Sequence, residues 1–474
     1  MCKTVVRWAS RSELRVVHTR KSHNSKKRDR ERSKSELRDV RCCSDIKQSA
    51  YSSAVACTLS HVPAQSIPSY IIRTFKMGLK DFKIHFDSPY ATYHPDQTVT
   101  GKVILTLDAP KKIKGIKISV KGEADTYWST DRQELNNEGR YINETDVVTA
   151  HEEYFKAQFY ILGSSSGEQI ELPSGTHTYP FNFVLPPSLP SSFESDFGRI
   201  RYTTKAVLDR PWKFDQETKV AFTVVSHFDL NKDAKASESV HLEKSKTFGC
   251  FCCVSPPLTV DITLPVRGYV PGQSIPVKVN VENQSGIQVD TIKLKLEKVV
   301  TYSATTPRSD KKIVETVVAE VSKGPIGGNA HTIVSYEQMI DVPPTPPSNL
   351  QNCGIIDLEY KLKIEACMAG FYHRNLRDST PIYIGTVPLS SYQMPQAPIK
   401  KIDYDAGDAD NAPSAPPVEL SPQQGLYPDL APPSYEESVS GTRPLRDGNE
   451  SEHLIGGESR FAPRYPVYNF KVSP

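Results

Sequence analysis

Apolar and polar residues alternate along most of the chain downstream of Met77. Ile116, Ile118 and Val120, for example, are separated by single polar residues, so their side chains lie on one side of an extended strand. Segments of this kind are short, and clusters of Pro, Gly, Asn and Ser separate them. We therefore predict an all-β fold of antiparallel strands, each with one buried and one solvated face, packed as β-sandwiches.

The sequence also contains an internal repeat. YHPDQTVTGKV at Tyr93–Val103 aligns without a gap with YVPGQSIPVKV at Tyr269–Val279, an offset of 176 residues. At the same offset, the apolar triplet described above is matched by alternating apolar residues in 292–296. Further along, LPP and IRY within Leu185–Tyr202 recur as VPP and LEY within Val342–Tyr360. Two copies of one β module therefore follow each other along the chain.

A chain of 474 residues exceeds what one hydrophobic core usually organises. We predict a basic extension at 1–76, a β-sandwich at 77–228, a linker at 229–257, a second β-sandwich at 258–387 and a proline-rich tail at 388–474. The extension and the tail are polar and show no sustained periodicity, so both are expected to be disordered.

The extension differs from the rest of the chain in charge. Residues 1–76 hold 17 Lys and Arg residues but only 6 Asp and Glu residues, although the net charge of the whole chain is only +3. This change in composition ends at Met77, which we interpret as the true or an alternative start. The basic run Lys21–Lys34 fits a nuclear localisation or nucleic-acid patch. Aromatic stacking residues do not accompany it, so a solvated tail is favoured and no nucleic-acid partner is expected.

Sequence patterns for catalysis are weak. GSSSG at Gly163–Gly167 satisfies the G-x-S-x-G pattern, which in hydrolases places a serine on a turn between a strand and a helix. Its flanks, AQFYIL and EQIEL, are both typical of strands, which favours a hairpin loop. A phosphate-binding loop and an H-E-x-x-H string are both missing from the sequence. We expect no enzyme, no catalytic residues and no cofactor.

The nine cysteines are scattered and odd in number, which indicates reduced thiols rather than a disulfide framework. Cys250, Cys252 and Cys253 form the string CFCC in the predicted linker. Zinc sites usually combine paired Cys or His ligands at recurring spacing, and a second pair does not follow, so no metal is expected. The cluster fits reversible palmitoylation, with free thiols as the favoured alternative.

The segment GRIRYTTKAVLDRPW at Gly198–Trp212 has a structural and a functional interpretation. In the structural one, Tyr202, Ala206 and Leu208 face the core and Trp212 closes one end of a sandwich. In the functional one, the segment contacts cargo. The structural interpretation is favoured.

Taken in order, these elements resemble the arrestin domain-containing proteins, the alpha-arrestins. The resemblance runs from about Met77 to the C-terminus and rests on the paired Y-x-P-[DG]-Q elements, on GRIRYTTKAVLDRPW, on CFCC followed by PPLTVDITLPVRGYVPGQSIPVKV, and on APPSYEE in the tail. It implies two tandem arrestin-like, that is immunoglobulin-like, β-sandwich domains. It also implies an adaptor that brings HECT-type E3 ubiquitin ligases to membrane proteins.

The tail holds a candidate ligase motif, PPSY, at Pro432, Pro433 and Tyr435. The prolines are expected to stack on WW-domain aromatic residues while the tyrosine fills a neighbouring pocket. They also hold the backbone near polyproline II, which reduces the entropy lost on binding. Members of the family commonly carry two P-P-x-Y motifs, whereas APRY at Ala462–Tyr465 lacks the first proline. This departure argues against bivalent ligase binding.

Two further strings lie in the tail. Pro413, Ser414, Ala415 and Pro416 form PSAP, which the ubiquitin-binding-like domain of the ESCRT-I complex recognises and which some similar proteins carry. A linker turn is the alternative interpretation. YPDL at Tyr427–Leu430 fits the tyrosine-based sorting pattern, but that pattern is so permissive that a chance match is favoured.

These observations predict a cytoplasmic adaptor that is recruited to the plasma membrane and to endosomes by peripheral association. Its expected partners are receptor or transporter cargo, WW domains of HECT-type ligases and ESCRT-I, and the expected outcome is cargo ubiquitination, endocytosis and endosomal sorting. The alternatives are a structural trafficking subunit of the retromer type, which shares the fold, and a nuclear regulator that uses the basic extension.

Overall fold

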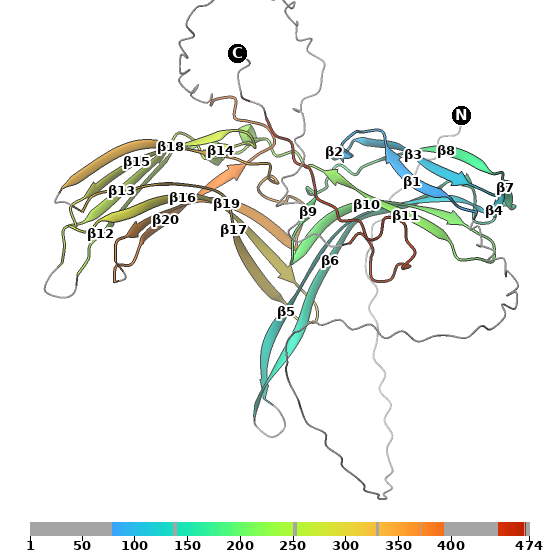
Figure 1. The fold of residues 1–474 in the computed structure, drawn as a ribbon, viewed down its shortest axis with the longest axis horizontal. Helices are drawn as coiled ribbons and strands as arrows, with labels where there is room; N and C mark the ends of the chain where they lie inside the picture. Colours follow the sequence, from blue (N-terminus) through green and yellow to red (C-terminus); the bar gives the residue numbers. More distant parts are fainter. Residues whose placement is uncertain are drawn as a thin grey trace, which may run out of the picture. The chain divides into compact units, whose positions relative to one another are not determined.

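The computed structural model describes residues 78–135, 140–249, 254–328, 331–370, 372–392, 444–468 and 470. The chain divides into the units Met1–Ile72 and Arg73–Pro474, and all described residues belong to the second unit. Their secondary structure consists of β-strands and the short 3-10 helices η1 (Leu230–Lys232) and η2 (Ala234–Ser237) (Figure 1). The predicted all-β fold class is confirmed. In these ranges no helix has the length and apolar character needed to span a bilayer.

The first module is a β-sandwich. Its sheets have the strand orders β1-β3-β8 and β2-β11-β10-β5-β6, with β9 added to β10 and a short β4-β7 ladder. The strands are β1 (Asp81–Phe86), β2 (Thr92–Tyr93), β3 (Thr98–Leu107), β4 (Lys111–Ile113), β5 (Gly115–Leu135), β6 (Tyr141–Gly163), β7 (Ile170–Leu172), β8 (Gly175–Val184), β9 (Phe193–Glu194), β10 (Gly198–Asp209) and β11 (Gln216–Val224).

The second module repeats this arrangement. Its sheets have the orders β12-β13-β15-β18 and β14-β20-β19-β16-β17. The strands are β12 (Val240–Lys246), β13 (Leu258–Leu264), β14 (Gly268–Tyr269), β15 (Ser274–Asn283), β16 (Val289–Ala304), β17 (Asp310–Lys323), β18 (Thr332–Asp341), β19 (Ile356–Met368) and β20 (Leu376–Ile384).

Alternation along the strands builds the core between the sheets of each module. In the first module Phe86 of β1 meets Phe222 of β11 across the two sheets, with ring centroids 5.6 Å apart in an edge arrangement. In the second module the valines of β15 at 277, 279 and 281 are fully buried, while Lys278 and Asn280 between them are exposed. The period of two residues read from the sequence therefore corresponds to the buried face of each strand.

The internal repeat places equivalent residues at equivalent sites. Tyr93 lies in β2, which pairs in parallel with β11, and Tyr269 lies in β14, which pairs in parallel with β20. The side-chain amide oxygen of Gln97 accepts a hydrogen bond from the backbone of His94 at 2.9 Å, and Gln273 accepts the same bond from Val270 at 2.9 Å. The repeated Y-x-P-[DG]-Q string is thus a turn that enters each sandwich, and the glutamine closes it.

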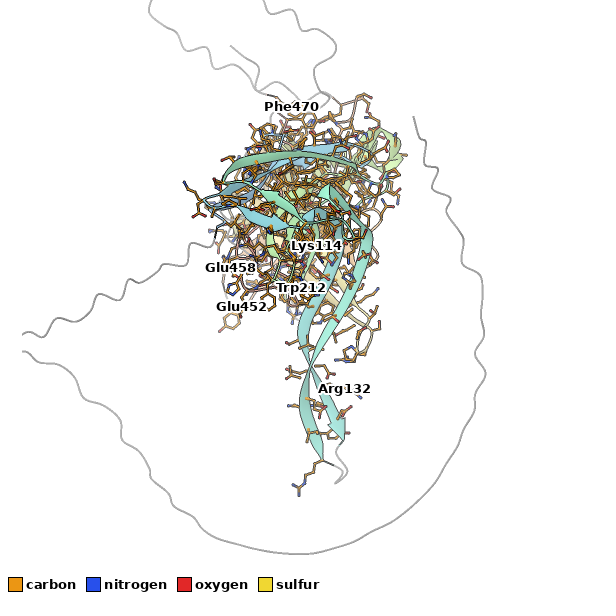
Figure 2. The ribbon with its side chains drawn as sticks, turned by 90° about the vertical axis from the view of Figure 1, so that its right-hand side faces the viewer. Lys114, Arg132, Trp212, Glu452, Glu458 and Phe470 are labelled. Atoms are coloured by element: carbon orange, nitrogen blue, oxygen red, sulfur yellow. The ribbon has the colours of Figure 1, made fainter. Side chains whose placement is uncertain are left out.

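β5 and β6 form the longest antiparallel pair of the first module, paired from Gly115 with Gly163 to Leu135 with Tyr141. Figure 2 shows this pair continuing away from the body of the sheet as a twisted ribbon that carries Arg132. Residues of the ribbon such as Tyr141 and Val147 are exposed. The ribbon therefore presents side chains that do not belong to the core.

The predicted linker at 229–257 is corrected by the structure. Its residues Val240–Lys246 form β12, which pairs with β13 from Val240 opposite Leu264 to Lys246 opposite Leu258. The strand lies at the edge of its sheet, so most of its side chains are polar and few are buried. Because β12 is mostly polar, it shows little of the apolar–polar alternation from which the other strands are predicted.

Two local predictions are also corrected. The GSSSG segment joins β6 to β7, but β7 pairs with β4, so the segment is not a hairpin loop. Tyr202, Ala206 and Leu208 are buried as predicted, whereas Trp212 is 99% exposed and does not close the sandwich. The backbone φ of Trp212 is +57°, in the left-handed region, and the turn directs its ring into solvent.

Candidate functional site

The residues of the predicted binding motifs lie outside the described residues. These are the PSAP residues 413–416, the PPSY residues 432–435 and the cysteines of CFCC at 250–253. The described chain stops at Tyr392 and resumes at Pro444, so both proline-rich motifs fall within the intervening segment. The structure therefore describes the chain before and after the two proline-rich motifs, but not the motifs themselves.

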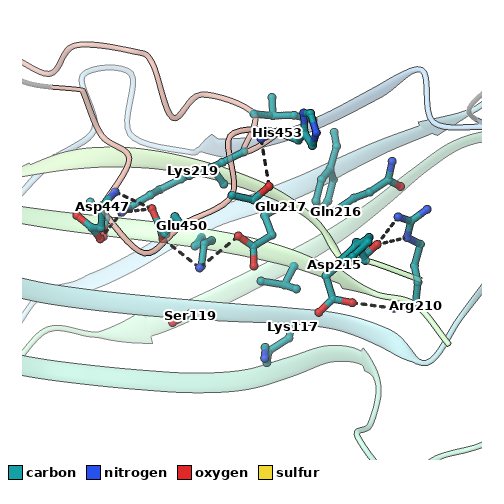
Figure 3. Close-up of a pocket in the computed structure, with 18 of the residues that line it drawn as sticks. Lys117, Ser119, Arg210, Asp215, Gln216, Glu217, Lys219, Asp447, Glu450 and His453 are labelled. Carbon is teal, nitrogen blue, oxygen red and sulfur yellow. Dashed lines mark hydrogen bonds and ion pairs between the residues drawn. The ribbon is translucent and has the colours of Figure 1, made fainter. Parts of the chain in front are cut away.

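The part of the predicted tail at 444–468 packs on the folded modules, which corrects the expectation of a tail without structure from 388 onward. Leu445, Leu454 and Tyr465 are buried. We call residues 444–468 the return segment, because it brings the chain back to the first module. Figure 3 shows its turn with Asp447 and Glu450 against the strands of that module.

The return segment lies on the polar face of the sheet β11-β10-β5. Along β10, residues such as Tyr202 and Ala206 face the core, so the alternate residues Arg201, Thr203 and Lys205 face the other way. Lys205 lies opposite Lys219 of β11, and Thr203 lies opposite Lys121 of β5. These registers gather cations from three strands on one face.

The turn of the return segment supplies carboxylates to cations on this face. Asp447 contacts Lys219 at 2.8 Å and Arg199 at 3.4 Å. Glu450 contacts Lys219 at 3.0 Å and Lys205 at 3.0 Å. The side chain of Lys219 is only 4% exposed. A cation buried to this extent is costly unless anions accompany it, so the two carboxylates stabilise both the segment and the sheet.

The pKa values of the two carboxyls reflect this pairing. Burial acts to raise the pKa of Asp447, but the hydrogen bond and charge of Lys219, with Arg199, outweigh it and bring the pKa below the ordinary 3.8. Burial also acts to raise the pKa of Glu450. The backbone hydrogen bond from Asp447 and the interactions with Lys219 outweigh that effect and bring the pKa of Glu450 below the ordinary 4.5.

Arg201 joins the start of the return segment to the sheet. Its guanidinium forms a bidentate pair with Glu194, with distances of 2.7 and 2.8 Å, and donates a third bond to the carbonyl oxygen of Pro444 at 3.0 Å. Both charged side chains are almost fully buried. Burial raises the pKa of Glu194, although its bond with Arg201 opposes the shift.

Backbone pairing continues the attachment. The amide of Lys219 donates to the carbonyl oxygen of Ile455 at 3.0 Å, and the amide of Ile455 donates to the carbonyl oxygen of Glu217 at 3.0 Å. β2 pairs with β11 only at Thr223 and Val224, so the backbone of residues 217–219 is left unpaired by β2. Ile455 forms a parallel β-bridge with Thr218 at this edge. The segment is thus bridged to the edge of the sheet at Ile455.

Two tyrosines complete the attachment and contact both modules. The hydroxyl of Tyr465 donates to the carbonyl oxygen of Ser192 in the first module at 3.0 Å. The hydroxyl of Tyr468 donates to the carbonyl oxygen of Thr386 in the second module at 2.6 Å, and its amide donates to Pro271 at 2.9 Å. The end of the return segment therefore bridges the modules.

A cavity of about 1220 Å³ lies between the return segment and the sheet. Its lining includes acids of the return segment and of the sheet, and the cations Lys80, Lys117, Lys121, Lys156, Lys205, Arg210 and Lys219. Sequence reasoning missed this site, because the pairing of Asp447 and Glu450 with cations more than 200 residues away leaves no local pattern. The only available signal was the recurrence of apolar and aromatic residues after Pro444 in a polar tail.

A group with metal-binding residue types was also missed. Glu123 and Asp125 of β5 and His151 of β6 hold their ligand atoms within 4.8 Å of one another. Lys121 forms an ion pair with Glu123, and Arg199 forms one with Asp125 at 2.9 Å. Cations of the chain already neutralise these carboxylates, so the group serves the polar face of the sheet.

Comparisons with known proteins agree with the tandem modules. Residues 82–231 match the family model for the N-terminal domain of arrestin (or S-antigen), and residues 255–389 match the model for the C-terminal domain. Arrestin domain-containing protein 17 of Caenorhabditis elegans is 30% identical over 442 residues, covering 82% of this chain and 99% of the relative. In Mus musculus, arrestin domain-containing protein 4 is 29% identical over 308 residues, covering 65% of this chain and 71% of the relative. Arrestin domain-containing protein 1 of the same organism is 26% identical over 340 residues, covering 71% of each chain.

Proposed function

Because the chain belongs to the arrestin domain-containing family, we propose that it is an adaptor that links membrane-protein cargo to HECT-type E3 ubiquitin ligases. In this proposal the tandem sandwiches engage a receptor or transporter, and PPSY at Pro432, Pro433 and Tyr435 engages a ligase WW domain. The result is ubiquitination, endocytosis and endosomal sorting of the cargo, by a cytoplasmic protein recruited to the plasma membrane and to endosomes.

The observation that carries the proposal is the attachment of the chain on both sides of PPSY. Before it, Tyr392 packs edge-on against Tyr269 of the second module, with ring centroids 6.1 Å apart. After it, Pro444 accepts a hydrogen bond from Arg201 of the first module. A ligase bound to the segment between Tyr392 and Pro444 is therefore tethered to the modules at two points, which keeps it close to whatever the modules hold.

The position of Tyr465 supports a single ligase site. The tyrosine of APRY is only 6% exposed, and its hydroxyl is hydrogen-bonded to Ser192. A WW domain needs the tyrosine ring in its own pocket. While the return segment is attached, that ring is occupied within the protein, so PPSY is the ligase motif of the proposal.

PSAP at Pro413–Pro416 supplies a second arm of the proposal, in which ESCRT-I binds the same intervening segment. Changing both prolines to alanine should abolish pulldown of the ESCRT-I ubiquitin-binding-like domain and leave ligase binding intact. Unchanged pulldown by the double variant would remove this arm and leave PSAP as a linker turn.

The adaptor proposal is tested by affinity purification of the full chain from cells, followed by mass spectrometry. Tyr435→Ala should lose HECT-type ligases while retaining membrane-protein cargo. Tyr427→Ala removes a tyrosine of the same segment outside the motif and is the matched control. Retention of the ligase by Tyr435→Ala would contradict the proposal, and recovery of one fixed partner complex from both variants would favour a structural trafficking subunit.

A further inference from the structure

The turn between β10 and β11 carries two large aromatic side chains in solvent. Trp212 is 99% exposed and Phe214 is 93% exposed, whereas Trp128 of the same module is buried. Tryptophan is highly buried on average in folded proteins, because its ring carries a large apolar surface. Two such rings on one short turn mark an interaction surface rather than a random exposure.

The turn is fixed in this conformation by its own residues. The guanidinium of Arg210 donates to the carbonyl oxygen of Phe214 at 2.8 Å from Nε, and the amide of Arg210 donates to the carboxylate of Asp215 at 3.1 Å. Between them, Trp212 has a φ of +57°, which is unfavourable for a bulky residue. A backbone held in this way keeps both rings pointing outward, so a surface that receives them meets a preorganised pair.

Cations of the turn and of β4 lie near the aromatic pair, together with the acids Asp108 and Asp215. Lys213 lies between the two aromatic residues in the sequence, and Lys111 of β4 contacts Gln216 at the end of the turn, with Nζ 2.6 Å from the amide oxygen. The amide of Lys114 donates to Asp209 at 2.9 Å, which places β4 beside the same turn. Figure 2 looks onto this end of the module, with Trp212 and Lys114 labelled.

Lys111 is partly buried and lies within the field of the other two cations. Burial, followed by the charges of Arg210 and Lys213, lowers the pKa of Lys111 to about 8, and the nearby Asp108 only partly opposes this shift. Repulsion of this kind is unfavourable in the isolated protein. An anionic surface that approached the turn would relieve it.

We propose that this turn, with Trp212 and Phe214 at its tip and Lys111, Arg210 and Lys213 around them, inserts into the interface of an anionic lipid bilayer. Tryptophan and phenylalanine rings partition to the boundary between headgroups and acyl chains. The surrounding cations then lie at the level of the phosphates, where each is attracted by the negative surface potential. A protein groove also accepts aromatic rings, but three cations close together at one turn favour a surface that carries many anionic groups. The inference does not depend on ligase recruitment.

The first test measures binding of the full chain to sedimentable vesicles of phosphatidylcholine containing about one third phosphatidylserine, an anionic lipid of the cytoplasmic leaflet. Trp212→Ser with Phe214→Ser should lower the vesicle affinity at least roughly tenfold. Lys111→Gln with Lys213→Gln should lower the affinity and weaken its salt dependence. Tyr141→Ser, which removes an exposed ring from the β5–β6 ribbon, is the matched control and should bind as the parent does.

The second test reads the position of the indole directly. In the full chain with Trp8→Phe and Trp128→Phe, the emission of Trp212 should shift to the blue on addition of these vesicles and should be quenched by lipids brominated on their acyl chains. The exposed side chains contribute little to folding, so the serine variants should unfold at the parent temperature. Unchanged emission at saturating vesicles would overturn the inference. So would vesicle binding by the double serine variant within about twofold of the parent. Either result would also be expected if the tip fits a protein groove instead.

Discussion

The hydroxyl of Tyr465 donates a hydrogen bond to the carbonyl oxygen of Ser192 at 3.0 Å, across 273 residues of sequence. Tyr465 belongs to a string that differs from a ligase motif by one proline, yet its ring is buried against the first module. The chain therefore contains two similar tyrosines, one that holds the return segment in place and one, Tyr435, that we assign to ligase binding.

We predict that Tyr465→Ala detaches the end of the return segment. Loss of the buried ring and its hydrogen bond should cost about 3 kcal/mol of local stability, as for a large aromatic truncation, whereas Tyr465→Phe removes only the hydrogen bond and should cost about 1 kcal/mol. Hydrogen exchange followed by mass spectrometry should show that residues 444–468 exchange fastest in the alanine variant, more slowly in the phenylalanine variant and most slowly in the parent. Equal protection in all three proteins would mean that Tyr465 does not anchor the segment.

A second prediction concerns the buried cation beneath the turn. Replacing Asp447 with Asn and Glu450 with Gln leaves Lys219 without its carboxylate partners, and breaking a buried pair in this way typically costs about 3 kcal/mol or more. The return segment should then become sensitive to limited proteolysis. Glu452→Gln alters an exposed acid of the same turn and is the matched control. If the control is cleaved as fast as the double variant, the pairing with Lys219 does not hold the segment.

The attachment should also depend on pH. The pKa values of Asp447 and Glu450 in the folded protein lie below their ordinary values of 3.8 and 4.5. A carboxyl with a depressed pKa contributes stability that is fully present above its ordinary pKa and is lost as the pH falls through the folded value. Protection factors of 444–468 should therefore be constant between neutral pH and pH 5 and should decrease below pH 4, and the double variant should lack this decrease. Loss of protection already near pH 6 would point to a different titrating group.

The repeat shows how much of the fold the sequence could predict. Its glutamines, and the pair Tyr202 and Tyr360, recur because each pair makes an equivalent hydrogen bond in each sandwich. The hydroxyl of Tyr202 donates to Pro190 at 2.6 Å, and that of Tyr360 donates to Pro346 at 2.8 Å. Bonds of this kind keep each tyrosine close in sequence to a proline-rich turn, so the pair is visible as a pattern in one chain.

The parts that were not predicted have no such local requirement. β12 is a polar edge strand, and its pairing with β13 is determined by the strand beside it rather than by its own sequence. The return segment depends on Asp447 meeting Lys219 from a distant strand, which leaves no spacing to detect. Trp212 is predicted to close one sandwich end, and only its 99% exposure in the structure shows that the ring lies in solvent.

The central claim, that PPSY and not APRY recruits the ligase, is tested most directly by calorimetric titration of an isolated WW domain of a HECT-type ligase with the full chain. A short extended motif should bind in the micromolar range, on the order of −6 to −8 kcal/mol. Tyr435→Ala should lower the affinity roughly thirtyfold, a cost of about 2 kcal/mol for loss of an aromatic anchor. Tyr465→Ala should bind within about twofold of the parent, because its string lacks a stacking proline. If Tyr435→Ala binds as the parent does, or if Tyr465→Ala is the variant that fails, the ligase site is misplaced and the proposed function is contradicted.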